Sequence, residues 1–419
     1  MVAASVREHH APALRALLAR MNRAPGEVDP YNTWLPFGRF EAIHFARLVV
    51  AQDRTLGERA CYPGLPEQEP LYLVLMVDCD GPADDILQRL VQEAGSGLRE
   101  IFQHCDGCEP DVDLCAWLRA RRTPASASYV NWVGRTVRQV REEAALHDTL
   151  RRVLHSHPQT LAPRELHRRL RHAVDSEEPE LTPLQPRSLG QWLAQVGEAA
   201  LLLLLGALLV VPGLLAAPLF LWLLRRHETR DPVLDLRSDA AVTRAIAQGE
   251  DRDVTNPFSA IGSLKPGAFR LCVTRAALWL LDRSCALLYH RGRLARVSTI
   301  HFAHWVLLDD SRRVFFASNY DGSLESYMDD FINKVAFGLN LVFSNGINYP
   351  PTDFLVLRGA WQEQRFKNYL HRRQLATDVW YKAYPGLTNA DLARNARIRR
   401  GLEHPPASDA GLRRWLAEI

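Results

Sequence analysis

The longest run of hydrophobic residues lies near the middle of the chain, at residues 199–224, and contains no charged residue. This run is apolar all round, whereas a helix that packs on a soluble core needs only one apolar stripe. It also exceeds the roughly 20 residues that cross a bilayer. The run therefore predicts contact with a membrane, and we assign residues 191–230 to a membrane-inserted segment.

Pro212 and Gly213 interrupt this run near its middle, and arginines flank both of its ends, among them Arg187, Arg225 and Arg226. Proline bends a helix, and an adjacent glycine allows a turn. Basic residues on both sides favour the cytoplasm for both ends. We therefore expect a helical hairpin that enters one leaflet and returns, a monotopic arrangement. A single kinked helix that spans the bilayer is the alternative.

Two stretches on either side of this segment share a pattern of apolar positions. The residues Ile-His-Phe-Ala occur at 43–46 and again at 300–303, each time at the start of a strand-like run. A second strand-like run follows in each copy and ends in Asp-Gly, at 80–81 and at 321–322. From there the apolar positions match without a gap, at helical spacing, through Phe102 and Phe343. The pattern indicates an internal duplication.

Each copy thus predicts two strands, an Asp-Gly turn, a helix and a further strand. The further strand is at 112–117 in the first copy and at 354–357 in the second. In the second copy a strand at 259–265 and a helix at 269–289 come first. The first copy has a helix at 12–22 and no clear strand before it. The order β-α-β-β-α-β is ferredoxin-like. We predict an α+β fold of two ferredoxin-like repeats, forming an α+β barrel, with an inserted apolar membrane hairpin or helix.

Length and composition limit the remaining possibilities. We divide the 419 residues into a first repeat (1–120), a helical connector and linker (121–190), the membrane-inserted segment (191–230), a second repeat (231–360) and a C-terminal aromatic and basic helical extension (361–419). With 51 basic and 48 acidic side chains, the net charge of +3 gives no reason to expect nucleic acid as a partner. The N-terminus lacks the apolar stretch of a secretory signal, so we expect the bulk of the chain to face the cytoplasm.

The repeated His and Asp residues are the strongest candidates for chemistry. In each copy the His begins one strand, and the Asp ends the next strand, just before a helix. An Asp at that place can instead cap the helix, and a His at a strand start can serve only as a hydrogen-bonding structural residue. We choose Asp321, His301 and Asn319 as candidate catalytic residues and expect the principal cavity to open beside them.

Duplicated ferredoxin-like units with an Asp-Gly turn resemble the dye-decolourising peroxidases, whose distal haem pocket carries a GxxDG motif. Asp321 and Asp80 match the Asp of that motif, whereas Ser318 and Val77 stand where the family has its first Gly. The resemblance implies a haem cofactor and an Asp that assists proton transfer. By position, the candidates for the haem ligand are His301, His304 and His371. Residues 256–402 also resemble an uncharacterised group of bacterial membrane-associated proteins.

These resemblances imply a membrane-associated, peroxidase-like oxidoreductase that acts on a hydrophobic substrate. The alternative is a non-catalytic module that docks on the lipid bilayer and binds a lipid or a protein; an oligomer is compatible with either. Cys105 and Cys108 have the spacing of a metal or redox pair, but with no second pair we interpret them as ordinary thiols and predict no metal site. Nucleotide-binding and serine-hydrolase motifs are absent from the sequence.

Overall fold

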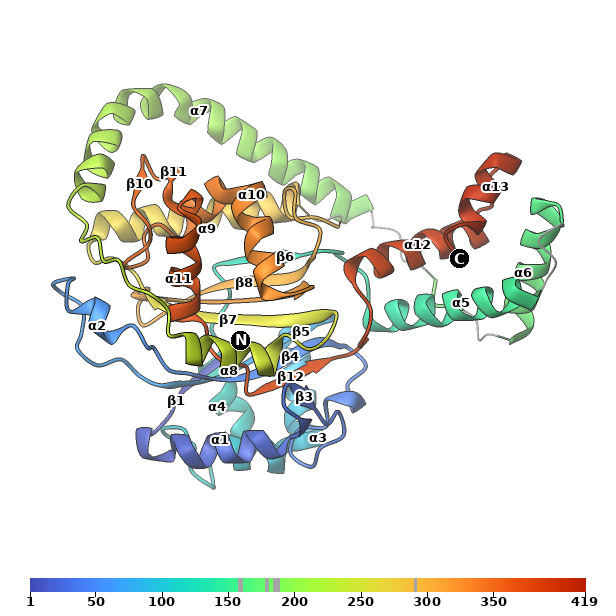
Figure 1. Ribbon diagram of the computed structural model, residues 1–419, viewed down its shortest axis with the longest axis horizontal. Coiled ribbons are helices and arrows are strands. Elements are labelled where there is room, and N and C mark those ends of the chain that lie inside the picture. The colour runs from blue at the N-terminus through green and yellow to red at the C-terminus, as the bar shows by residue number, and fades with distance from the viewer. Residues whose placement is uncertain (157–160, 178–180, 184–188, 290–291) are drawn as a thin grey trace.

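The computed structural model describes the chain except for residues 157–160, 178–180, 184–188 and 290–291. The protein is a mixed α+β protein with antiparallel sheets and one long apolar helix (Figure 1). In chain order, its strands and α-helices are β1 (Val2–Ser5), α1 (Ala11–Arg20), β2 (Asn22–Ala24), β3 (Glu27–Val28), β4 (Ile43–Ala51), α2 (Leu56–Arg59), β5 (Tyr72–Cys79), α3 (Ala83–Phe102), α4 (Leu114–Ala120), β6 (Ala127–Val130), α5 (Val137–Ser156), α6 (Pro163–Glu177), α7 (Leu189–Glu228), α8 (Ala240–Glu250), β7 (Thr255–Ser263), α9 (Ala268–Leu287), β8 (Ile300–Leu308), β9 (Arg313–Asp321), α10 (Leu324–Phe343), β10 (Thr352–Asp353), β11 (Leu357–Arg358), α11 (Glu363–Arg373), β12 (Val379–Lys382), α12 (Asn389–Glu403) and α13 (Asp409–Leu416).

Two four-stranded antiparallel sheets form the centre of the molecule. Their strand orders are β1-β5-β4-β12 and β6-β8-β9-β7. The sheets lie face to face over a shared apolar layer that contains Val49, Val74 and Met76 from one sheet and Ile261, Val306 and Phe315 from the other. Helices α1, α3 and α4 cover the outer face of the first sheet, and α9, α10 and α11 cover that of the second (Figure 1).

The two sheets are built in the same way. β4 pairs with β5 as β8 pairs with β9, and β1 pairs with β5 as β7 pairs with β9. A register shift falls at His44 in β4 and at His301 in β8, so both histidines sit in β-bulges. The helix after each hairpin is interrupted at the same place, by non-helical dihedral angles at Ala94 in α3 and Val335 in α10. The halves therefore share strand order, bulge position and helix kink.

Each half also contributes a short strand to the sheet of the other half. β6 follows the first half along the chain but pairs with β8, and β12 follows the second half but pairs with β4. The chain then enters a long helix in both cases, α5 after β6 and α12 after β12. The segments 121–190 and 361–419, which the sequence suggests are a connector and an extension, thus each supply a strand to a central sheet.

Two predicted strands are wrong. Residues 112–117 enter helix α4, because the Asp113 carboxylate accepts from the backbone N–H groups of Cys115 and Ala116 and so caps a helix start. Residues 354–356 form the turn of the small β10–β11 hairpin and Leu357 begins β11; Phe354 and Leu355 in this turn have positive φ values that a strand does not permit.

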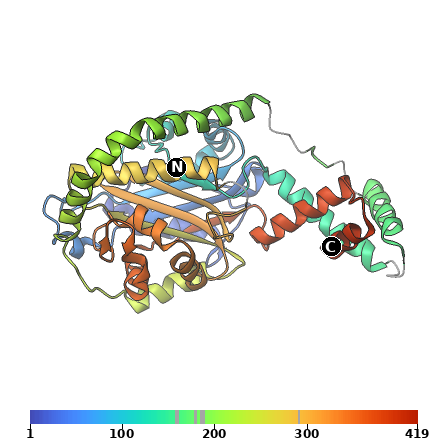
Figure 2. The same cartoon turned by 90° about the horizontal axis from the view of Figure 1, so that it is seen from above.

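Helices α5, α6, α12 and α13 form an arm that projects from one end of the sheets (Figure 2). Their contact faces share a separate apolar core that includes Leu146, Leu170, Ile398 and Trp415. The arm begins directly after β6 and β12, so the two exchanged strands lead into one helical unit.

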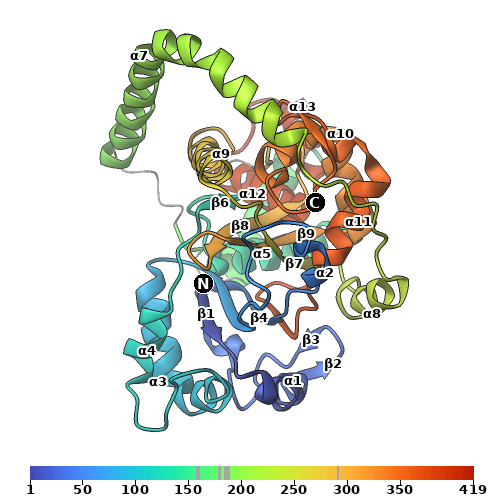
Figure 3. The same cartoon turned by 90° about the vertical axis from the view of Figure 1, so that its left-hand side faces the viewer.

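Helix α7 contains the apolar segment. The stretch Trp192–Glu228 is long and apolar enough to cross a membrane, and none of its most apolar window is buried. The helix continues through Pro212 and Gly213, so the predicted hairpin turn is wrong and the single helix is what the structure has. It bows away from α9 along its middle (Figures 1 and 3).

Both ends of α7 contact α9. Glu198 forms an ion pair with Arg283 near the end of α9. At the start of α9, Phe269 stacks on His227 with ring centroids 4.9 Å apart, and Phe220 lies 5.8 Å away. The apolar middle of α7 therefore forms an arch whose two ends meet the same side of the body.

Candidate functional site

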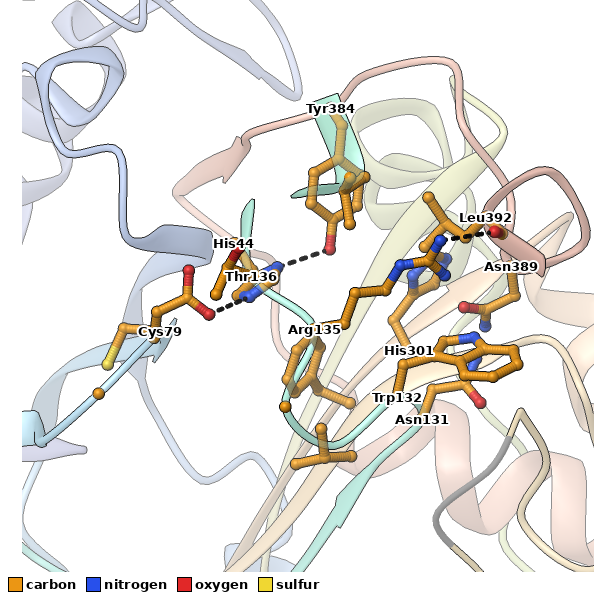
Figure 4. A pocket seen from close by; sticks show the side chains of 16 residues that line it. His44, Cys79, Asn131, Trp132, Arg135, Thr136, His301, Tyr384, Asn389 and Leu392 are labelled. Atoms are coloured by element: carbon orange, nitrogen blue, oxygen red, sulfur yellow. Dashed lines mark hydrogen bonds and ion pairs between the residues drawn. The ribbon is translucent and has the colours of Figure 1, made fainter. Parts of the chain in front are cut away.

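A cavity of about 270 Å³ lies where the two loops that follow the exchanged strands meet the bulges of β4 and β8 (Figure 4). We call it the junction cavity, because both halves contribute to it. The side chains that carry polar groups into its lining are His44, Cys79, Asp80, Asn131, Trp132, Arg135, Thr136, His301, Tyr384 and Asn389.

A His–Asp pair stands on each side of this junction. His44 Nε2 lies 3.0 Å from Asp80 Oδ1, and His301 Nε2 lies 2.7 Å from Asp321 Oδ1. Each His occupies the bulge of its strand, and each Asp ends the neighbouring strand. Because a bulge changes the direction in which a side chain points, the bulge is what lets each His reach the Asp of the adjacent strand.

Both aspartates bind the start of a helix, but not the helix that the sequence suggests. Asp80 Oδ2 accepts from the backbone N–H of Val137 at 2.9 Å, and Asp321 Oδ2 accepts from that of Asn389 at 2.7 Å. Val137 begins α5 and Asn389 begins α12. The expected cap of the helix that directly follows each Asp-Gly is wrong, since α3 has no side-chain cap and Ser323 caps α10. The aspartates therefore tie the sheets to the arm.

The two His–Asp pairs differ at the second ring nitrogen. His44 Nδ1 lies 3.0 Å from the hydroxyl of Tyr384, so both of its ring nitrogens are bound. Tyr384 stands five residues before the start of α12, and Trp132 occupies the corresponding place before α5. The indole of Trp132 therefore presents an N–H donor where Tyr384 presents a hydroxyl, which can both donate and accept. Among the described residues, Nδ1 of His301 has no hydrogen-bond partner, which leaves it available to a ligand.

Several buried polar atoms around the junction cavity also lack a partner among the described residues. They are Asn131 Nδ2, Trp132 Nε1, Arg135 Nη1 and both amide atoms of Asn389. Asn131 and Asn389 are only 3% and 4% exposed. Buried polar groups are normally hydrogen-bonded, because leaving one unpaired costs roughly 1–3 kcal/mol. Five such atoms thus stand beside one cavity.

Arg135 brings the positive charge to this group. Its other terminal nitrogen donates to the Leu392 carbonyl at 2.9 Å and forms an ion pair with the buried Glu143. Burial lowers the pKa of Arg135 to about 10, so the side chain is still a cation near neutral pH. Burial also raises the pKa of the neighbouring Cys79 thiol to about 11, which keeps that thiol protonated and a poor nucleophile.

Only one of the predicted site residues lines the junction cavity, namely His301. Asp321 stands behind it as its hydrogen-bond partner. Asn319 belongs to a buried polar network between the sheets, where its amide donates to Asp78 Oδ2 at 2.8 Å and its oxygen accepts from Arg47. The expected cavity beside His301 thus opens toward the first half and toward the exchanged strands, with Asn319 and Asp321 outside its lining.

The other two predicted haem ligands are bound elsewhere. His304 Nε2 lies 2.6 Å from Asp78 Oδ1, and its Nδ1 lies 3.1 Å from the hydroxyl of Ser128. Burial raises the pKa of Asp78, but the neighbouring His304 and Arg47 lower it more, so its net pKa lies below the ordinary value. His371 lies 3.3 Å from Gln374 and 3.5 Å from Glu325.

The junction cavity does not match haem in size, since its volume of about 270 Å³ is below the roughly 300–1,000 Å³ of ordinary cofactor pockets. Of the three alternative haem ligands, only His301 lines this cavity. No group of three or more His, Cys, Asp or Glu residues that could hold a metal ion occurs among the described residues. Cys105 and Cys108 are free thiols, and burial raises the pKa of Cys105 to about 12.

Sequence reasoning missed Asn131, Trp132, Arg135 and Asn389. A signal for them exists, because the duplication continues into the exchanged segments. Residues 130–136 read VNWVGRT and residues 382–388 read KAYPGLT, with the Gly and Thr at equal places. Gly134 and Gly386 both have a positive φ, of 83° and 79°, which favours glycine. A search for a second repeated motif would have found this loop.

Comparisons of the chain with protein-family models, with curated proteins and with solved structures find no match. Function must therefore be inferred from the geometry of the junction cavity and from the long apolar helix α7.

Proposed function

We propose that this protein is a monotopic membrane protein that binds a small oxyanion in the junction cavity, where His301 exchanges a proton with the ligand. The unpaired buried donors around the cavity carry this proposal. Asn131 Nδ2, Trp132 Nε1 and Arg135 Nη1 are all donors, and one of them is cationic. A carboxylate or phosphate group accepts several hydrogen bonds and favours a guanidinium partner.

His301 supplies the proton-transfer group. The Asp321 carboxylate accepts from Nε2–H, so the neutral imidazole has its lone pair on Nδ1, the atom without a described partner. A proton taken up at Nδ1 makes the ring an imidazolium, which Asp321 stabilises. This is the arrangement of a general base whose orientation a carboxylate fixes. His44 lacks this capacity, because Tyr384 already binds its Nδ1.

The geometry of α7 supports docking on one face of a membrane. Both ends of its apolar arch contact α9, and a helix that spans a bilayer would place its ends on opposite sides. The exposed apolar residues of the arch would then lie in one leaflet, as in other interfacial segments. Arg225, Arg226 and Arg230 at one end favour the cytoplasmic side for the body.

The arrangement of each half supports the ferredoxin-like interpretation. The second half has the order β7-α9-β8-β9-α10, and a bridge between Ala260 and Gln374 adds a fourth element beside β7. The first half has the equivalent bridge, between Val2 and Arg122. We propose two duplicated ferredoxin-like units on this basis. Peroxidase-like chemistry, haem and a hydrophobic substrate stay predictions from the resemblance, and we derive no step through haem.

Thermal unfolding with added acetate or inorganic phosphate tests the binding proposal, with equal concentrations of sodium chloride as the ionic control. A ligand at 100 times its Kd stabilises the folded state by about 2.7 kcal/mol. We expect one of the two anions to raise the melting temperature, and Arg135→Gln to abolish the rise. Arg138→Gln is the matched control, because that side chain lies three residues further along the chain, at the start of α5, and is 68% exposed. No rise with either anion, or an equal rise in Arg135→Gln, would refute the proposal.

Calorimetry in two buffers of different ionisation enthalpy tests the proton transfer. Wild-type protein should take up a proton as the anion binds, because a negative ligand beside His301 favours the imidazolium. His301→Gln should bind the anion without that uptake. Proton uptake that persists in His301→Gln would assign it to another group.

A further inference from the structure

The outer face of the second sheet carries an apolar cavity of about 200 Å³ between α9 and α10. Its lining includes Leu281, Trp305, Phe331 and Val335. Leu280 and Phe337 also line it and are 50% and 54% exposed, so the cavity opens to the surface between the two helices. We call it the α9–α10 slot.

The first half of the molecule fills the corresponding place with its own chain. Gly338 in α10 corresponds to Gly97 in α3, each sixteen positions after the Asp-Gly glycine. A methyl group on Gly97 would lie 1.9 Å from the backbone oxygen of Trp34, so the segment around Trp34 packs directly on α3. A methyl group on Gly338 would meet no atom within 4 Å.

The connections explain this difference. In the first half, residues 21–42 join α1 to β4, and Trp34, Phe37 and Phe40 from this segment contribute to the core against α3. In the second half, a shorter connection joins α9 to β8, and its described residues Tyr289, Leu294 and Ala295 line one side of the slot without contacting the position of a Cβ on Gly338. An apolar surface that the chain covers in one half is thus left open in the other.

We propose that one acyl chain of a bilayer lipid occupies the α9–α10 slot. This inference rests on the proposed membrane docking. The slot borders α9, whose two ends contact the apolar arch of α7 (Figure 3). Trp279 and Leu288 are exposed and add apolar surface along α9 beside the slot residues Leu280 and Tyr289. A lipid chain matches an apolar lining that is continuous with this surface, whereas a headgroup would lose its hydration there.

Photocrosslinking of the full-length protein in phosphatidylcholine vesicles tests this proposal. The lipid carries a diazirine near the end of one acyl chain, and mass spectrometry maps the modified residues. Gly338→Leu places a side chain in the slot. Gly95→Leu is the matched control, because it makes the same change at a helical glycine of α3 where the added Cβ meets only Val91, at 4.0 Å. Equal melting temperatures of the two variants establish that both fold.

We expect labelling of both α7 and the slot residues in the wild type. In Gly338→Leu, labelling of the slot residues should fall at least tenfold while labelling of α7 stays unchanged. In Gly95→Leu, both should stay unchanged. Labelling of α7 without the slot would overturn the lipid slot and leave the docking proposal intact. Labelling of neither would overturn both. Equal slot labelling in Gly338→Leu, or a change in oligomeric state instead of in labelling, would also overturn the proposal, the latter in favour of a second copy of the chain.

Discussion

Replacing Asp321 by alanine tests whether the His–Asp pairs hold the two halves and the arm together. The carboxylate accepts from His301 at 2.7 Å, from the Asn389 backbone at 2.7 Å and from the Thr255 hydroxyl at 3.1 Å. These partners belong to β8, to the start of α12 and to β7. Asp80 binds two partners, on β4 and at the start of α5.

The expected losses follow from what each substitution leaves unpaired. Asp321→Ala removes the partner of two buried donors, His301 Nε2 and the Asn389 N–H, while the Thr255 hydroxyl keeps the Leu387 carbonyl at 3.2 Å. Each orphaned buried donor costs roughly 1–3 kcal/mol, so for the two donors we expect a loss of about 2–6 kcal/mol. The Asp80 side chain is 24% exposed against 10% for Asp321. Because water can replace more of its bonds, Asp80→Ala should cost about 1–2 kcal/mol, the range of an ordinary cap.

Urea unfolding in detergent micelles, followed by circular dichroism, measures both losses from the transition midpoints at constant slope. Asp321→Asn is the control, since it keeps the shape and one acceptor oxygen and should recover part of the stability. Equal losses at Asp321 and Asp80, or a loss below about 0.5 kcal/mol at Asp321, would refute the role of these carboxylates as described.

Three other expectations concern pH, topology and cofactor. Burial raises the pKa of Glu250 to about 7. The unfolded state, with a pKa near 4.5, loses its proton first as the pH rises, so stability should fall by up to about 3 kcal/mol between about pH 4.5 and 7. Urea midpoints at pH 5 and 8 should show this fall in wild type and a smaller one in Glu250→Gln. Single cysteines at the exposed positions Asp175, beside the buried Val174, and Asp239 should be labelled from the same side of the membrane, and labelling from opposite sides would refute monotopic docking. Purified protein that is incubated with haem and then freed of the excess should show no Soret band, because the junction cavity is smaller than ordinary cofactor pockets; a stoichiometric band would support the peroxidase prediction.

The local pattern of the sequence was enough to predict the hairpins of both halves. Strands β4, β5, β8 and β9 have continuous apolar runs, and the Asp-Gly turns and the phased helices after them repeat in register. The apolar run of α7 was equally plain. The hairpin turn predicted within α7 was wrong, because a helix that packs against nothing along its middle can continue through Pro212. The proline costs one hydrogen bond and bends the helix.

The contacts of the site could not be predicted in this way, because they join residues far apart in sequence. Asp80 and Asp321 bind helix starts 57 and 68 residues away. The exchanged strands β6 and β12 have four residues each, too few for a period-two pattern to stand out. β1 is equally short and two of its four residues are alanine, so no strand was evident before α1. His301 was found because the repeat marks it, whereas Arg135 and Asn131 needed the strand exchange to reach the junction cavity.

Nitrogen-15 NMR of histidine side chains tests the central claim most directly. This claim is that Nδ1 of His301 is free to bind a ligand, whereas the Tyr384 hydroxyl occupies Nδ1 of His44. Protein labelled at histidine, with assignments from His301→Gln and His44→Gln, is titrated with acetate and with inorganic phosphate at constant ionic strength. Our account predicts that the ring nitrogens of His301 shift with the bound anion, that those of His44 do not, and that Tyr384→Phe makes His44 respond as well. Equal responses of both histidines in the wild-type protein, or none from His301, would contradict it.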